Sequence, residues 1–411
     1  MTAAEAQTDD TARARRAEFT HPARLLILAL AFATAATATD MYLPAFPAIR
    51  RAFNATPQFV QLSLSVFLYG SACGQLLFGP ISDRWGRRPV LLVGLAAYAL
   101  ASLGCALADG PQSFLVFRSL QGVAAAAGPV LIRAMVADRL ERVEAVRMLA
   151  LLTGLMAFLA MLTPIAGGWL VHNGSWRWIF LVIAGIGFFI VCAGAFTFRE
   201  TLPVANRLPA LSAGTVLGGY LEIARTLPFW GYVLPSGLMF ASVFAYVGTN
   251  SFLLIDQLGM RTEHHGAVYA LAACAFVAGS LTSGRLTQRW GVERLITRAI
   301  LFGVSAMALA SLASATLPLS VPLVVAPGVV MFFGAALVVP AAAASAVSLF
   351  PRRAGSASAV AGCTQIALAG VSAGIAGTLV STSTVPLHLF MLAGTACAAL
   401  VWRAGRGRRA L

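Results

Sequence analysis

Residues 74–88 read GQLLFGPISDRWGRR, and residues 279–294 read GSLTSGRLTQRWGVER. The letters that the two stretches share keep one offset of 205 residues, so that Gly74 matches Gly279 and Trp85 matches Trp290. The chain has 411 residues, and the offset is therefore close to half of its length. The repetition predicts two copies of a unit of about 200 residues.

The composition places both copies in a membrane. The chain is 59% hydrophobic and 11% charged, with a mean hydropathy of +0.82, which is too apolar for a soluble protein of this size. A membrane-spanning helix needs about 20 apolar residues. We expect an all-α membrane protein with twelve transmembrane helices in two pseudo-symmetric six-helix bundles. The expected spans are 25–48, 57–81, 89–108, 112–137, 146–171, 177–198, 227–252, 265–287, 295–316, 318–349, 355–381 and 384–402.

The positions of the arginines predict the orientation. All basic residues are Arg, and with both termini in the cytoplasm only Arg50, Arg51, Arg177 and Arg261 fall in external loops. Such a bias sets membrane topology and accounts for the net charge of +14 without nucleic-acid binding. The expected parts are a cytoplasmic tail at 1–22, an N-terminal bundle at 23–199, a cytoplasmic linker with a short surface helix at 200–226, a C-terminal bundle at 227–403 and a tail at 404–411.

The motifs of enzymes and metal sites are missing from the sequence. None of the five histidines has H-E-x-x-H spacing, the six cysteines show no pair spacing, and there is no P-loop. These motifs would supply zinc, disulfide or nucleotide chemistry. We therefore expect no enzyme activity, no metal and no cofactor, and internal repeats in an apolar chain are typical of transporters.

The loop sequence at 74–88 resembles the signature of the major facilitator superfamily. Arg118-Ser-Leu-Gln121-Gly122 is similar to the R-x-x-Q-G motif of its proton-driven drug exporters, and Asp40-Met-Tyr-Leu-Pro-Ala-Phe-Pro47 resembles the element of the bicyclomycin and chloramphenicol/florfenicol resistance (Bcr/CflA) branch. Trp176-Arg-Trp-Ile-Phe180 is also similar to these exporters. The resemblance implies proton-coupled export of a small drug across the bacterial inner membrane by a monomer that works in the lipid bilayer.

One expected motif is degraded. Antiporters of this superfamily usually carry G-P-x-x-G-G in the fifth helix, whereas this chain has Thr163-Pro-Ile-Ala-Gly-Gly168. Proline removes a backbone donor and bends helices. We expect helix bends at Pro44, Pro164, Gly167 and Gly168, and at Pro44 an ordinary helix end stays open as the alternative.

Asp40 and Arg118 are the candidate proton-coupling residues. Asp40 lies about eight residues, roughly 12 Å, from the external end of the first span, and Arg118 lies about six residues, roughly 9 Å, inside the fourth. An ionisable residue within a membrane is costly and marks a functional site. A carboxyl group withdrawn from water binds a proton more readily, and a nearby arginine opposes this. Two readings stay open, a pair that separates during transport and a permanent pair that fixes helix packing.

Charged residues at the cytoplasmic ends of the helices form a candidate latch. Glycines let neighbouring helices approach closely, and Asp83 can pair with arginines nearby. A simple loop with a positive charge bias is the alternative. In the second copy Asp83 has become Gln288 and Arg118 has become Leu323, which favours the N-terminal half for proton coupling. The candidates are Gly74, Gly79, Asp83, Arg84, Gly86, Arg87, Arg88, Asp138 and Arg142.

Polar residues inside apolar spans are candidates for contact with substrate. The alternative for each is an interhelical hydrogen bond. They are Tyr42, Gln61, Tyr69, Gln121, Tyr246, Asn250 and Gln365. A proton-coupled symporter, or an exporter of an endogenous metabolite, remains the alternative function.

Overall fold

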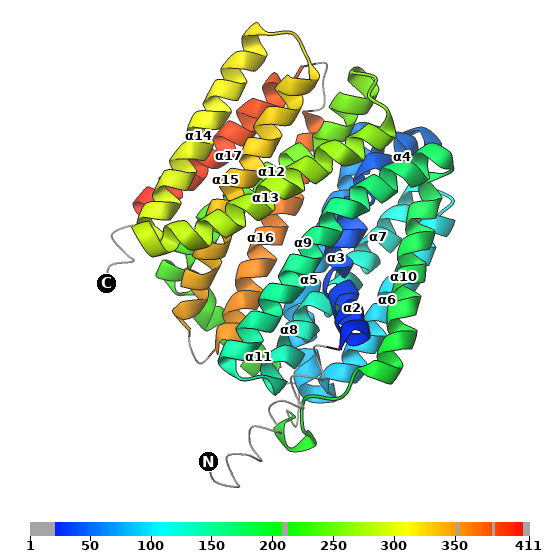
Figure 1. Cartoon of the computed structure of the whole chain (residues 1–411), viewed down its shortest axis with the longest axis vertical. Helices are drawn as coiled ribbons and strands as arrows, with labels where there is room; N and C mark the ends of the chain where they lie inside the picture. The colour runs from blue at the N-terminus through cyan, green and yellow to red at the C-terminus, as the bar shows by residue number, and fades with distance from the viewer. Residues whose placement is uncertain (1–20, 208–212, 351–352, 380–382, 406–411) are drawn as a thin grey trace.

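The computed structural model describes residues 21–207, 213–350, 353–379 and 383–405, and within these ranges it is built from helices (Figure 1). The N-terminal half contains α2 (Pro22–Phe32), α3 (Thr34–Asp40), η1 (Leu43–Ala45), α4 (Phe46–Ala52), α5 (Pro57–Trp85), α6 (Arg87–Leu107), α7 (Pro111–Ala125), α8 (Ala127–Arg139), α9 (Arg142–Asn173) and α10 (Trp176–Thr197). Between the halves lie η2 (Val204–Asn206) and α11 (Ala213–Ala224). The C-terminal half contains α12 (Leu227–Ser251), the π-helical turn η3 (Phe252–Gln257), α13 (Thr262–Trp290), α14 (Val292–Thr316), α15 (Val321–Ser348), α16 (Ala354–Thr378) and α17 (Val385–Ala404).

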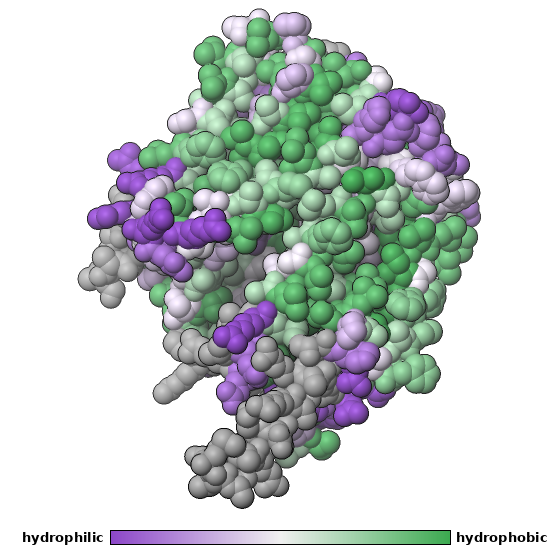
Figure 2. All heavy atoms as spheres, in the orientation of Figure 1, coloured by the Kyte–Doolittle hydropathy of each residue, from purple (hydrophilic) through white to green (hydrophobic). Residues whose placement is uncertain are grey.

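The number of spans agrees with the sequence. Eleven helices of the described chain are long and apolar enough to cross a membrane, and a bent pair near the N-terminus makes a twelfth. Figure 2 shows a broad band of hydrophobic residues across one face, with hydrophilic residues gathered in patches on its two sides. The prediction of a twelve-helix membrane protein is confirmed.

The first span differs from the expected one. It continues to Ala52 instead of ending at residue 48, and its main bend, of 58°, lies between Phe32 and Thr34 rather than at a proline. At Pro44 the α-helix gives way to a 3₁₀ turn and then resumes. Because the span is longer, Asp40 lies twelve residues from its external end, a depth of about 18 Å.

The repeated sequence makes the same local structure in both halves. An added Cβ at Gly74 would meet the Val123 carbonyl of α7, and one at Gly279 would meet the Phe333 carbonyl of α15. Both repeats then end at a glycine with positive φ, 96° at Gly86 and 75° at Gly291. Glycine adopts a backbone conformation of this kind far more easily than other residues. The glycines that the two repeats share therefore produce a close helix contact followed by a sharp turn between helices.

Two pairs of helices join the halves. Helix α5 packs on α16, and α9 packs on α13. An added Cβ at Gly168 would meet the Thr262 carbonyl, and one at Gly266 would meet the Pro164 carbonyl, so the two backbones touch there. Helix α9 is continuous through Pro164. The predicted role of Gly168 as a bend is therefore better described as close packing, and the same holds for Gly167, which faces the Met41 carbonyl of the first span.

The helix α11 contacts both halves. The Tyr220 hydroxyl donates to the Leu76 carbonyl of α5 at 2.9 Å, and Arg353, before α16, lies 2.6 Å from Glu222. Burial, together with the nearby Asp83 carboxylate, raises the pKa of Tyr220. The phenol is thus a neutral donor at physiological pH, and it fixes the linker helix to the N-terminal half.

Candidate functional site

The carboxylate of Asp40 contacts the opposite half of the molecule. Asp40 is 9% exposed at the end of α3, and its Oδ1 accepts a hydrogen bond from the Tyr269 hydroxyl of α13 at 3.1 Å. It is the only acid that lies more than three residues from the end of a described span. A single buried carboxylate therefore joins the two halves at the depth where a substrate would pass.

Arg118 lies beside Asp40 without pairing with it. The Arg118 Nη1 donates to Gln121 Oε1 at 2.5 Å and to the Ala38 carbonyl, two residues before Asp40, at 3.4 Å. The long Arg118 side chain thus reaches the backbone next to Asp40, although the two residues lie at different distances from the ends of their spans, twelve residues for Asp40 and seven for Arg118. No ion pair among the described residues joins them, so the alternative of a permanent Asp40–Arg118 pair is wrong for this conformation.

Aromatic rings surround the Arg118 guanidinium. The side chain is fully buried, and its Cζ lies 4.3 Å from the ring centre of Tyr42, 4.4 Å from that of Phe67 and 5.7 Å from that of Phe180. Cation–π attraction of this kind is worth about 2 kcal/mol when the cation is desolvated. Gln121 in turn donates to Ser102 at 2.8 Å. Rings and an amide hold the charge of Arg118, which leaves Asp40 free to change its partner.

Most of the substrate-cavity candidates form contacts between helices. The Tyr42 hydroxyl bonds to the Ser63 hydroxyl, Gln61 donates to the Gly248 carbonyl across the halves at 2.8 Å, and Asn250 bonds to His265 at 2.9 Å. These three residues are fully buried. The interhelical alternative therefore describes them in this conformation.

The remaining candidates differ in exposure. Tyr246 is buried with its ring against Gly328, and Gln365 is half-buried on the α16 face that packs on α12. Tyr69 is 38% exposed and packs against Gly370 of α16. Of the seven candidates, Tyr69 has the most accessible side chain.

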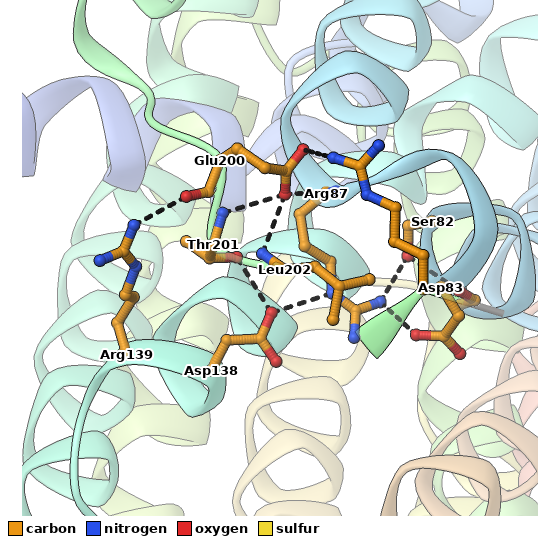
Figure 3. Close-up of polar contacts among 10 residues, drawn as sticks. Ser82, Asp83, Arg87, Asp138, Arg139, Glu200, Thr201 and Leu202 are labelled. Atoms are coloured by element: carbon orange, nitrogen blue, oxygen red, sulfur yellow. Dashed lines mark hydrogen bonds and ion pairs between the residues drawn. The ribbon is translucent and has the colours of Figure 1, made fainter. Parts of the chain in front are cut away.

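Three of the predicted latch residues, Asp83, Arg87 and Asp138, lie together, with Arg87 in contact with the other two (Figure 3). The Arg87 guanidinium lies 2.6 Å from Asp83 and 3.0 Å from Asp138, and it donates to Ser82 at 2.6 Å. Three helices, α5, α6 and α8, are joined by this one side chain. All of them belong to the N-terminal half, so the cluster holds that bundle together and does not itself bridge to the C-terminal bundle.

Glu200 is a member of the cluster that was predicted only as part of the linker. Its Oε1 accepts from the backbone N–H groups of Arg87, Thr201 and Leu202 at 2.9–3.0 Å. A carboxylate at the start of α6 accepts hydrogen bonds from free backbone N–H groups, and its negative charge is stabilised by the positive end of the helix dipole. Since Glu200 follows the last span of the first half, it ties the linker to the latch. No spacing in the sequence indicates this contact.

The other latch candidates have separate surroundings. Arg84 stacks on Trp85, Arg88 donates to the Ala195 carbonyl at 2.6 Å, and nothing lies near the place of an added Cβ at Gly79. Arg142 begins α9, and its side chain lies outside the described part of the structure. Among the described side chains, those of Arg84 and Arg88 do not join the ion pairs of Arg87.

A second set of polar contacts joins the halves at the ends of the spans opposite the Arg87 cluster. Asp256 in η3 lies 3.1 Å from Arg50 and 3.6 Å from Arg51 of α4. His172 of α9 lies 3.3 Å from Glu263 of α13. Sequence reasoning missed this set, although Arg50 and Arg51 are exceptions to the arginine bias and thereby mark an unusual external loop. These contacts join the two halves at that end of the molecule.

Comparison with known proteins identifies one superfamily and, within it, drug resistance proteins. A model of the Major Facilitator Superfamily matches residues 28–374. The chain is 31% identical to a chloramphenicol resistance protein of Pseudomonas aeruginosa over 359 residues, covering 87% of this chain and 83% of that protein. It is 27% identical to a bicyclomycin resistance protein homolog of Haemophilus influenzae over 357 residues, covering 86% and 88%.

One further relative matches only part of the chain, and one solved structure has a similar fold. An uncharacterized MFS-type transporter, YdgK of Bacillus subtilis, is 37% identical over 248 residues, and this alignment spans 60% of the chain and 61% of that relative. The crystal structure of a D-xylose-proton symporter superposes with a TM-score of 0.71 at 17% identity, covering 93% of this chain and 97% of that one. This last likeness concerns the fold alone.

Proposed function

The chain belongs to the Major Facilitator Superfamily, in the branch of bicyclomycin and chloramphenicol resistance proteins, and from this premise we propose that it exports small antibiotics in exchange for protons. The substrates would be molecules of the bicyclomycin or chloramphenicol type, because relatives that match most of the chain carry these names. It would act as a monomer in the bacterial inner membrane with both termini in the cytoplasm.

The hydrogen bond between Asp40 and Tyr269 is the observation that carries the proposal. It joins a carboxylate of one half to a phenol of the other. Alternating access moves the halves apart on one side of the membrane at a time. Opening the external side would break this bond and expose Asp40 to external water, where the carboxylate would take up a proton.

The return step uses the same contact in reverse. When the external ends close, Tyr269 approaches Asp40 again, and the phenol donates its hydrogen to the carboxylate. A donor of this kind offsets part of the cost of ionising a buried acid, and the proton would leave toward the cytoplasm when water reaches Asp40 from that side. The drug would enter the opened cytoplasmic side while Asp40 is ionised, and the next proton would follow only after the halves have moved.

Arg118 supports this exchange without taking part in an ion pair. Its charge lies near the Ala38 carbonyl and is surrounded by rings. The role we propose for Arg118 is to hold the backbone at Ala38, two residues before Asp40, in place, so that proton binding by Asp40 depends on the position of Tyr269.

Drug accumulation in cells that express the protein tests the proposal. Chloramphenicol, florfenicol, bicyclomycin and a sulfonamide would be measured with the proton gradient intact and after its collapse, beside the Asp40→Asn variant. We expect lower accumulation of at least one drug, dependent on both the gradient and Asp40. Accumulation that rises with the gradient would instead identify a symporter. If all four drugs are unaffected, while a cell metabolite is exported, the protein carries an endogenous substrate.

A further inference from the structure

Arg133 is a second arginine inside the fourth span, and the proposed cycle does not use it. It lies six residues before the end of α8 at Arg139, a depth of about 9 Å from the cytoplasmic end of the helix, and its side chain is exposed. An arginine that faces lipid at such depth is strongly unfavourable, and ionisable residues in spans usually face a water-filled space. The exposure of Arg133 therefore indicates a wet surface inside the transporter.

The contacts of α8 show which neighbouring helix Arg133 faces. Ala126 faces Gly74 of α5, Ala127 faces Gly94 of α6, and Gly128 faces Ala31 of α2. At about 100° per residue, Arg133 points within roughly 20° of Ala126 and about 120° away from Ala127. It is thus on the side of α5, the helix that packs on α16 of the other half, and away from the outer helix α6.

One aromatic ring contacts the guanidinium. The Cζ of Arg133 lies 5.3 Å from the ring centre of Phe32, a buried residue of α2. The side chain therefore extends from the α5 side of α8 to the first span, across the inner side of the N-terminal bundle. The Phe32 ring contacts the guanidinium of Arg133, and the N–H groups of Arg133 remain able to donate hydrogen bonds.

The charge of Arg133 has no counter-ion within the described chain. No ion pair or hydrogen bond there involves its guanidinium, in contrast to Arg87 and Arg118. The nearest acid along α8, Asp138, is engaged by Arg87 and by the Thr201 hydroxyl at 2.9 Å. The guanidinium is a planar group of N–H donors. Because those of Arg133 have no acceptor among the described residues, they are suited to bind a carboxylate through two parallel hydrogen bonds.

We propose that Arg133 and Phe32 form a subsite that binds the carboxylate or another oxyanion of an aromatic substrate on the cytoplasmic side. The inference rests on the proposed function, since it concerns molecules that enter from the cytoplasm. The guanidinium pairs with the oxyanion, and an aromatic ring of the substrate stacks on the face of the guanidinium opposite Phe32. A cation meets repulsion at the same place, so the subsite selects by charge.

Binding of two dyes with a shared ring system tests the subsite. Fluorescein is anionic and rhodamine 123 is cationic, and both carry a xanthene core. Fluorescence anisotropy with the purified full-length protein would compare the unmodified chain with Arg133→Gln, Arg133→Lys and Phe32→Leu. Arg403→Gln, at the cytoplasmic end of α17, is the control for loss of one positive charge elsewhere.

We expect the unmodified chain to prefer fluorescein. Arg133→Gln would weaken fluorescein binding about tenfold or more, the usual effect of losing hydrogen bonds to a charged group, and would leave rhodamine binding unchanged or stronger. Arg133→Lys would keep part of the preference, because the charge remains without the planar fork. Equal effects on both dyes, an effect of Arg403→Gln as large as that of Arg133→Gln, or no fluorescein binding by the unmodified chain would overturn the subsite.

The test separates the subsite from the proposed function because binding is measured without a proton gradient. If dye selectivity follows Arg133 but no drug is exported, the subsite stands and the exporter proposal fails. If proton-driven export is found and Arg133→Gln binds fluorescein normally, the exporter proposal stands and the subsite fails. Thermal stability of each variant shows whether a loss of binding reflects a loss of folding.

Discussion

Asp40 of the N-terminal half accepts a hydrogen bond from Tyr269 of the C-terminal half at 3.1 Å, and Arg118, which donates to the Ala38 carbonyl two residues before Asp40, is held by Gln121 and by aromatic rings. The acid and the base of the candidate site therefore have different partners. Asp40 is tied to the element that moves, whereas Arg118 is tied to its own bundle. This division makes the protonation of Asp40 dependent on the relative position of the halves.

Replacing Asp40 with Asn should separate drug binding from proton coupling. The amide keeps the size and an acceptor oxygen for Tyr269 but carries no charge and exchanges no proton. We expect drug binding to the purified protein within about threefold of the unmodified chain, with loss of gradient-driven export from loaded vesicles. Export at the normal rate by Asp40→Asn would exclude this residue as the proton carrier.

Removing the Tyr269 hydroxyl should weaken closure of the external side. A net contribution of about 0.5–1.5 kcal/mol for one hydrogen bond corresponds to a shift of roughly two- to twelvefold toward the outward-open form in Tyr269→Phe. Spin labels on Ala52→Cys and Gln257→Cys, which are exposed on opposite halves, would report the external distance after replacement of the six native cysteines. Tyr98→Phe is a matched control, because the Tyr98 hydroxyl bonds to Thr34 within one half. An equal shift in both variants would argue against a special role of Tyr269.

The sequence predicted the fold because its signals are local. Apolar runs predict the spans, and the repeated glycines predict the helix contacts at Gly74 and Gly279. Counting residues predicted similar depths for Asp40 and Arg118, but the first span continues to Ala52 and places Asp40 deeper than expected. The partner of Asp40 could not be predicted, since Tyr269 lies 229 positions away and no spacing rule connects the two halves. Glu200 and Asp256 were missed for the same reason, as each contacts a residue far along the chain.

The ion pairs of Asp256 should stabilise the same closed form independently. Asp256→Asn leaves Arg50 and Arg51 adjacent without a counter-charge. Partly exposed pairs contribute up to about 1 kcal/mol, so we expect a shift of up to about fivefold toward the longer distance between the two spin labels. The shift should shrink at high salt, because screening weakens exposed pairs. Asp109→Asn, in another external loop, is the control, and an unchanged distance distribution in Asp256→Asn would assign these contacts no part in closure.

The cluster around Arg87 should be required for transport but not for insertion. In Asp83→Asn the side chain keeps its volume and loses the charge that faces Arg87 at 2.6 Å. We expect normal amounts of protein in the membrane and a loss of drug export, because the cluster sets the position of α5, α6 and α8 at the cytoplasmic end. Membrane content by immunoblot and export from the same cells provide the two measurements. Normal export at normal membrane content would show that the cluster is only a topology signal.

Gly86 and Gly291 offer a matched pair of substitutions to measure what Glu200 adds to the first repeat. Both residues have positive φ with ψ near the extended range, a conformation that is essentially restricted to glycine, and alanine there costs about 1–3 kcal/mol of backbone strain. At Gly291 nothing lies within 4 Å of an added Cβ, whereas at Gly86 it would meet the Glu200 carboxylate and Arg207. We therefore expect Gly86→Ala to lower the thermal stability of the purified protein more than Gly291→Ala. In a Glu200→Ala background the two substitutions should become similar. A larger loss from Gly291→Ala would contradict the idea that Glu200 packs the turn of the first repeat more tightly than the second.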